Sequence, residues 1–367
     1  MSEPDPPLLT TCDYESAARR RLPAAVWDYL AGGSGSEATL AGNQAAFGRW
    51  ELRPRVLVDV SRCELAVELL GSRLAAPIGV APMAYHMLAH PDGEVATARA
   101  AGAAGQLLVV SPFASRRLEE IAAAATGPLW LQLYWLRERA VLVDLVGRAE
   151  AAGFRAIVLT VDTPRVGRRL RDLRHGFALP PGVAAANIDP AVMAGTGSGR
   201  PGESAIERHS REQFDPSLSW PDLAWLRELT RLPVVLKGVL TAEDAALAVA
   251  HGAAAVVVSN HGGRQLDRSV ASLDALPEVV DAVAGRCPVL LDGGVRSGTD
   301  VLTALALGAR AVLVGRPVLW GLALAGADGA RAVLELLVTE LEQVLALAGR
   351  PRVAELDRSL LTRAPAP

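Results

Sequence analysis

The sequence of 367 residues predicts an α/β protein folded as a (β/α)8 TIM barrel. Eight short apolar runs, rich in Val, Leu and Ile, recur along the chain, with segments of helical spacing between them. Near-continuous apolar strands that alternate with helices are typical of a parallel sheet covered by helices. The alternative is a doubly wound open sheet of about six strands. The count of eight, and the lack of a GxGxxG motif after the first run, favour the barrel.

The elements follow one another in a regular order. We expect strands at residues 77–82, 107–111, 129–134, 156–162, 234–238, 255–260, 289–294 and 311–316. Helical patterns span residues 93–105, 139–153, 241–252 and 298–308. We expect a single domain over residues 1–367, with an N-terminal helical cap at 1–76, a barrel core at 77–316 and closing C-terminal helices at 317–367.

One connection is too long for an ordinary barrel loop. After the fourth strand, residues 171–218 separate the last strand residues from the next helical pattern, PDLAWLRELT. Loops beyond about 15 residues without structure of their own are commonly lids or disordered segments. We therefore expect a lid at 171–218, with a mobile Gly/Ser/Pro-rich centre at about 194–206.

Composition excludes several classes of partner. The net charge of −3 and the pI near 6.1 give no basic excess of the kind that binds nucleic acid or an anionic membrane. The N-terminus lacks the pattern of a signal peptide, and no apolar run approaches the ~18 residues of a membrane span. The three cysteines are widely spaced, which indicates neither a disulfide framework nor a metal site. We expect a cytoplasmic protein that acts on a small molecule.

Polar or glycine residues end seven of the eight apolar runs. Catalytic groups of this fold lie at the carboxyl ends of the strands, which makes candidates of Ser111, Gln132, Tyr134, Thr160, Asp162, Lys237, Ser259, Asn260, His261, Asp292, Gly293, Gly294, Gly315 and Arg316. The segments DGGVRSGTD and GRPV also offer backbone N–H groups, Arg296 and Arg316 to a phosphate. The alternative for these two segments is a pair of plain β–α turns.

Four of the polar residues suggest acid–base chemistry on a carboxylate. His261 is the candidate base because imidazole titrates near neutral pH, and Asp162 could hold its ring. Arg169 and Arg264 could clamp a substrate carboxylate. Each has an ordinary alternative: a structural histidine, a surface carboxylate, or one of many surface arginines.

Lys237 is the only lysine among the 37 basic residues. Wherever any cation suffices, this chain uses arginine. The retained lysine therefore predicts a site where a compact ammonium fits and a planar guanidinium does not.

The motifs SNHGGRQLD, LTVDTPRVGRR, LKGVLTAEDA, DGGVRSGTDVLTALALGA and VGRPV resemble the FMN-dependent α-hydroxy-acid oxidases and dehydrogenases over nearly the whole chain. The resemblance implies that His261 is the active-site base and Asp162 its ion-pair partner. It also implies that Arg169 and Arg264 bind the substrate carboxylate, and that two tyrosines hydrogen-bond the substrate, namely Tyr29 and Tyr134. Both a carbanion route and a hydride route use these residues.

The resemblance implies FMN as the cofactor and no metal. Lys237 matches a lysine beside the N1–C2=O edge of the flavin, where positive charge stabilises the anionic reduced form. The other positions assigned to the flavin site are Pro82, Met83, Ala84, Ser111, Gln132, Thr160, Ser259, Asp292, Gly293, Gly294, Arg296, Gly315 and Arg316. An isomerase or IMP-dehydrogenase-type barrel would explain the glycine loops alone, and a non-catalytic binding protein would explain the fold alone.

Three residues suggest an aromatic substrate. Family members that act on glycolate have Trp where this chain has Phe113, and Met83 and Tyr85 are expected to line the same wall. Ordinary repacking is the alternative. Stretches such as AYHMLAHPDGE and WLQLYWLRE are most similar to actinobacterial 4-hydroxymandelate oxidases, which serve the biosynthesis of peptide antibiotics.

Ala84 is similar to the alanine of the oxidases, which favours O2 as the electron acceptor and hydrogen peroxide as a product. The substrate implied is an (S)-2-hydroxy acid. The alternatives are a glycolate- or lactate-type oxidase and a soluble mandelate dehydrogenase with another acceptor. Relatives are commonly tetramers, so we expect a homo-oligomer.

Overall fold

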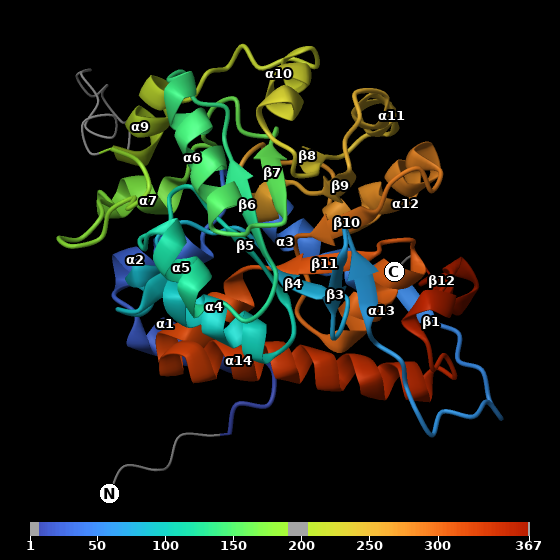
Figure 1. Ribbon diagram of the computed structural model, residues 1–367. Coiled ribbons are helices and arrows are strands. Elements are labelled where there is room, and N and C mark those ends of the chain that lie inside the picture. Colours follow the sequence, from blue (N-terminus) through green and yellow to red (C-terminus); the bar gives the residue numbers. More distant parts are fainter. Residues whose placement is uncertain (1–6, 190–204, 366–367) are drawn as a thin grey trace, which may run out of the picture.

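The computed structural model describes residues 7–189 and 205–365, and its centre is a closed barrel of eight parallel strands (Figure 1). The strands are β4 (Ile78–Val80), β5 (Leu107–Val110), β6 (Leu129–Leu133), β7 (Ala156–Thr160), β8 (Val234–Val239), β9 (Ala255–Val258), β10 (Val289–Asp292) and β11 (Ala311–Val314). β11 pairs with β4 and closes the barrel. The predicted fold class is confirmed.

Helices surround the barrel because each strand leads into an amphipathic segment with one apolar face. They are α4 (Gly93–Ala103), α5 (Leu118–Ala124), α6 (Arg139–Ala151), α10 (Asp222–Leu229), α11 (Ala242–Ala250), α12 (Ser272–Val283), α13 (Gly298–Ala306) and α14 (Arg316–Leu347). Side-chain caps mark the first residues of several helices. At α13, Ser297 and Asp300 form a capping box. α14 is kinked at Gly326 and packs along α4, α13 and the N-terminal helix α1 (Thr11–Arg21). In the described ranges no helix is long and apolar enough to cross a membrane.

The N-terminal segment is only partly helical. α1 (Thr11–Arg21), α2 (Ala24–Ala31) and α3 (Ala38–Ala45) are followed by β1 (Trp50–Leu52), which pairs with β12 (Leu361–Arg363), and by the hairpin of β2 (Val67–Leu69) and β3 (Ser72–Leu74). The hairpin lies at the amino ends of the strands, because Arg310, just before β11, donates to the Glu68 carbonyl at 3.3 Å. The segment therefore reaches both ends of the barrel.

Asp267, in the loop after β9, connects that loop to the N-terminal segment. Its carboxylate accepts hydrogen bonds from the Ser36 N–H at 2.7 Å, the Ser36 hydroxyl at 2.6 Å and the Thr39 N–H at 3.1 Å. α3 is thereby held over the carboxyl ends of the strands. Gly35 has φ of 54°, and a Cβ there would lie 2.7 Å from the Asp267 carboxylate, so the close approach requires glycine.

The long connection after β7 contains two helices in its described part, α7 (Leu170–His175) and α9 (Ala205–Gln213). The chain after α9 is tied to the loop after β6, since the Arg137 N–H donates to the Gln213 carbonyl at 2.8 Å and Leu136 bridges Phe214. The predicted mobile centre at about 194–206 falls almost entirely outside the described residues.

Tight packing of α13 on α14 gives a stability prediction. A Cβ on Gly298 would overlap the backbone of Glu340 and Leu341, so Gly298→Ala should lower the free energy of unfolding by about 1–3 kcal/mol. Gly147 is the control: it is exposed on α6 with nothing within 4 Å of a Cβ, and Gly147→Ala should raise stability by up to about 1 kcal/mol. Urea unfolding followed by circular dichroism measures both. Equal midpoints for the two variants would contradict the packing argument.

Candidate active site

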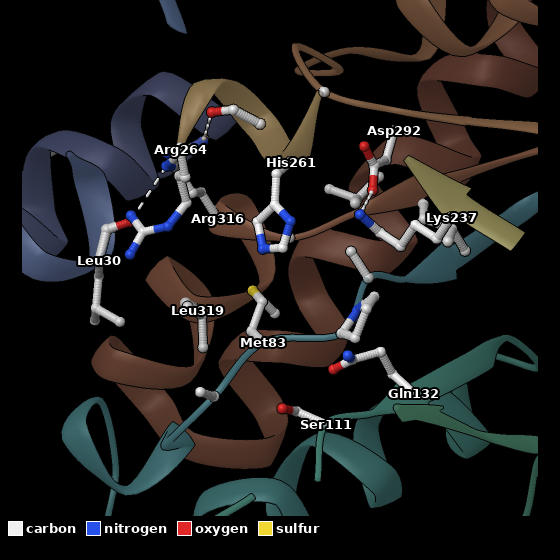
Figure 2. Close-up of a pocket in the computed structure, with 18 of the residues that line it drawn as sticks. Leu30, Met83, Ser111, Gln132, Lys237, His261, Arg264, Asp292, Arg316 and Leu319 are labelled. Carbon is white, nitrogen blue, oxygen red and sulfur yellow. Dashed lines mark hydrogen bonds and ion pairs between the residues drawn. The ribbon is translucent and has the colours of Figure 1, made fainter. Parts of the chain in front are cut away.

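A large cavity, open to solvent, lies at the carboxyl ends of the barrel strands. Figure 2 shows side chains from many strand ends converging on it. Among the predicted site residues, its walls include Tyr29, Pro82, Met83, Ala84, Ser111, Gln132, Tyr134, Thr160, Arg169, Lys237, His261, Arg264, Asp292, Gly293, Gly294, Arg296, Gly315 and Arg316. The fold therefore gathers residues that are spread over almost 290 positions of sequence into one site.

His261 and Asp162 are hydrogen-bonded at the cavity wall, with Nδ1 and Oδ1 3.0 Å apart. His261 begins the short helical turn η3 (His261–Gly263). Its φ is 59°, an unusual value for a residue other than glycine. Its N–H donates to the Ser259 hydroxyl at 3.0 Å. Burial lowers the pKa of His261, although Asp162 opposes the shift. The shift favours the neutral ring, whose Nε2 lies 3.5 Å from the Tyr134 hydroxyl.

The carboxylate of Asp162 remains ionised despite its burial. Burial alone would raise the pKa of this group, but His261 and Lys237 outweigh it and lower the pKa. An ionised Asp162 accepts a hydrogen bond from Nδ1–H, which leaves the lone pair of His261 on Nε2. The close approach of the neighbouring strand depends on Gly238, at a shift in the β8–β9 register, since a Cβ there would lie 2.6 Å from the Asp162 Cβ.

Lys237 is buried at the end of β8 with only 3% of its surface exposed. Its Nζ lies 2.9 Å from Asp292 Oδ2, as Figure 2 shows, and donates to the Ser259 hydroxyl at 2.9 Å. Burial alone would lower the pKa of Lys237, but Asp292 and Asp162 outweigh it, so the pKa is raised and the ammonium is charged. Two close partners, Asp292 and Ser259, leave room for a compact ammonium and explain the retained lysine.

Arg169 and Arg264 approach one face of the cavity together, with their guanidinium carbons 6.0 and 5.3 Å from the centre of the Tyr29 ring. Burial and the charge of Arg169 lower the pKa of Arg264 to about 10. Asp172 in α7 is buried nearby; burial raises the pKa of its carboxyl against the pull of both arginines. Arg169 Nε is buried without a hydrogen-bond partner among the described residues. Such a pair suits a carboxylate ligand.

Arg316 lines the cavity, as the sequence analysis expects, and it also makes contacts that the sequence does not predict. Its guanidinium donates to the backbone carbonyls of Gly32 at 2.9 Å, Gly262 at 3.1 Å and Leu30 at 3.2 Å, the last marked in Figure 2. It thus joins the N-terminal segment to the turn that carries His261. Burial, followed by the charges of Arg264 and Arg296, lowers its pKa.

Two residues differ in position from the sequence expectation. Ser259 does not line the cavity; it is fully buried and holds Lys237 and His261 from behind. Met83 lines the large cavity but not the adjoining aromatic pocket, because its side chain lies near Gly315. Strand-end pattern alone does not distinguish residues that face a cavity from residues that support it.

An aromatic pocket adjoins the large cavity and shares Tyr29, Ala84, Tyr134, Arg169 and His261 with it. As expected, Tyr85 and Phe113 line it, with their ring centres 6.4 Å apart. Phe214 and His209 complete the wall and were missed by the sequence analysis. They belong to the segment that follows the long connection, and no local pattern marks them as pocket residues.

The residues present fit a flavin with a phosphate group. Gln132 Nε2, Asp292 Oδ1 and Arg296 Nε are buried polar atoms that lack hydrogen-bond partners in the part of the chain that is described. A ligand with polar ring edges would satisfy such atoms at the cavity wall. The mutual repulsion of Arg169, Arg264, Arg296 and Arg316 also favours anionic ligands.

Comparison with known proteins agrees with this geometry. The model of the FMN-dependent dehydrogenase family matches residues 18–363. The chain is 52% identical over 343 residues to 4-hydroxymandelate oxidase of Amycolatopsis orientalis, covering 93% of this chain and 94% of that protein. It is 49% identical over 354 residues to L-lactate oxidase of Nostoc sp., with 95% and 96% coverage. Glycolate oxidase of Spinacia oleracea is 48% identical over 347 residues, with 95% and 94% coverage.

Solved structures give the same result. A mandelate oxidase with (S)-4-hydroxymandelic acid superposes with a TM-score of 0.92 at 50% identity, over 97% of this chain and 99% of that one. The match extends through the barrel and the segments that cover it. The chain therefore belongs to the FMN-dependent dehydrogenase family.

Proposed function

We propose that the protein oxidises an (S)-2-hydroxy acid to the 2-keto acid and that 4-hydroxymandelate or mandelate is the preferred substrate. The observation that carries the proposal is the neutral base of the Asp162–His261 pair, which shares a cavity with the arginine pair Arg169 and Arg264. Bound FMN supplies a two-electron acceptor that O2 regenerates with release of hydrogen peroxide. Lys237, Gln132 and Arg296 are the residues we assign to holding it.

Each side chain has a separate task in this proposal. Arg169 and Arg264 bind the substrate carboxylate, and Tyr29 and Tyr134 orient it. Oxidation removes two electrons and two protons from the Cα–H and O–H groups, and His261 Nε2 accepts one proton in both the carbanion and the hydride route. Asp162 stabilises the imidazolium that forms.

The aromatic pocket supports an aryl substrate. Phe113 stacks with Tyr134 at 5.5 Å and with Phe214 at 6.1 Å, so a flat apolar wall extends from the base. A phenyl ring gains apolar contact there that a glycolate or lactate side chain does not. The similarity to lactate and glycolate oxidases makes a small 2-hydroxy acid the second candidate.

The substrate assignment is tested by anaerobic bleaching of the purified yellow holoenzyme. We expect mandelate and 4-hydroxymandelate to bleach the flavin faster than lactate or glycolate, and admission of air to restore the colour with stoichiometric peroxide. Faster bleaching by glycolate or lactate would favour the second candidate. If air does not restore the colour or give peroxide, and another electron acceptor does restore the colour, the enzyme is a dehydrogenase.

The acid–base assignment gives a prediction for pH dependence. Since burial lowers the pKa of His261 below its ordinary value of 6.5, the acidic limb of kcat/KM should have its midpoint below pH 6.5, as the ring is protonated. Asp162→Asn removes the group that raises this pKa, so the acidic limb should move to still lower pH while the plateau drops by about 10²–10⁴-fold.

The control for the pH profile is Asp328→Asn, at a carboxylate whose side chain is 86% exposed. This variant should keep the wild-type profile. A limb that moves to higher pH in Asp162→Asn, or an unchanged plateau, would contradict the pairing of Asp162 with the catalytic base.

Lys237→Arg tests the argument from the single lysine. The charge is kept, but the planar guanidinium does not fit between Asp292 and Ser259, so we expect flavin content after purification to fall about tenfold or more. The ratio of flavin to protein absorbance measures it, and circular dichroism reports on the fold. Arg73→Lys at an exposed position is the control. Normal flavin content and turnover in Lys237→Arg would refute the assignment.

A further inference from the structure

α9 forms the outer wall of the aromatic pocket and is held on both sides. The Val166 N–H, in the loop after β7, donates to the Ser210 hydroxyl at 3.3 Å. On the other side, Phe214 bridges Leu136 and stacks on Tyr134 at 4.7 Å. The helix therefore has a defined position relative to the base, and His209, one residue before Ser210, lines the pocket.

A chain of ring contacts links His261 to His209 through Tyr134 and Phe113. The His261 and Tyr134 ring centres are 6.4 Å apart, those of Tyr134 and Phe113 are 5.5 Å apart, and Phe113 meets His209 edge-on at 5.5 Å. The residues shared with the large cavity include His261 and Tyr134 but neither Phe113 nor His209. The pocket thus has a reactive end and a distal end.

A substrate held at the reactive end must direct its side chain toward the distal end. Arg169 and Arg264 would bind the carboxylate beside His261, and an aryl ring would extend along Tyr134 and Phe113. In a para-substituted ring the substituent is the atom farthest from Cα. The distal end offers an imidazole, which can donate or accept one hydrogen bond and so matches a phenolic hydroxyl.

We propose that His209 is a specificity-determining residue that hydrogen-bonds a para-hydroxyl group on the aromatic ring of the substrate. The proposal rests on the proposed function, because it needs an aryl 2-hydroxy acid at the reactive end. A site that hydrogen-bonds a substrate hydroxyl discriminates against the analogue that lacks it, since its own polar group then loses a partner. His209 therefore selects 4-hydroxymandelate over mandelate.

The test compares kcat/KM for 4-hydroxymandelate, mandelate and lactate in the wild-type holoenzyme and in His209→Phe. The variant should lower the ratio for 4-hydroxymandelate over mandelate about tenfold, which is 1.4 kcal/mol, and leave lactate unchanged. His209→Gln keeps a donor and an acceptor and should restore part of the ratio. Glu207→Gln, on the same helix but outside the pocket lining, is the control and should keep the wild-type ratio.

A binding measurement separates recognition from turnover. Perturbation of the flavin spectrum by 4-hydroxyphenylacetate and phenylacetate gives their dissociation constants, and His209→Phe should weaken only the former. If the wild-type enzyme is active on aryl acids and His209→Phe changes neither the kcat/KM ratio nor the ratio of dissociation constants, the role of His209 is overturned but the proposed substrate class is not. Wild-type enzyme that prefers lactate or glycolate overturns the proposed substrate as well. If His209→Phe does not fold, His209→Leu, which also removes both ring nitrogens, decides by the same ratio.

Discussion

Two buried acid–base pairs across four neighbouring strand ends are the constraint on which the rest of the site depends. Asp162 follows β7, Lys237 lies in β8, His261 follows β9 and Asp292 ends β10. An unpaired buried charge costs several kcal/mol, so the ammonium and the two carboxylates must each meet a hydrogen-bonding partner when the barrel closes. The two pairs formed, at 2.9 and 3.0 Å, hold the imidazole and the ammonium on the cavity wall. Ser259 lies between them and orients both.

The opposite side of the cavity carries positive charge that the protein itself neutralises only in part. Arg264 and Arg316 both donate a hydrogen bond to the Gly32 carbonyl. Backbone dipoles therefore offset part of their positive charge. Their pKa values, lowered by burial and by mutual repulsion, record the resulting electrostatic cost. An anionic ligand would relieve it, which is the physical reason for proposing that the cavity binds carboxylate and phosphate groups. Preorganised charge of this kind needs little rearrangement when the ligand arrives.

The barrel and the long connection after β7 contribute different parts of the site. The strand ends supply the base, its partner and the candidate flavin contacts, all on rigid backbone. The connection after β7 supplies Arg169 at the start of α7, and its return through α9 supplies Phe214 and His209. Substrate choice can therefore vary through the connection while the chemistry stays on the barrel, as is common for loops on a fixed scaffold.

The sequence by itself determined the eight strands, the face on which the site lies and the importance of Lys237 and His261, because apolar periodicity and the residues that end a strand are local properties. Tertiary structure decided what those residues contact. Arg316 turns to backbone carbonyls because the N-terminal segment folds over it. His209 and Phe214 reach the pocket because a connection of more than forty residues returns to the barrel, and no local pattern records where such a segment packs.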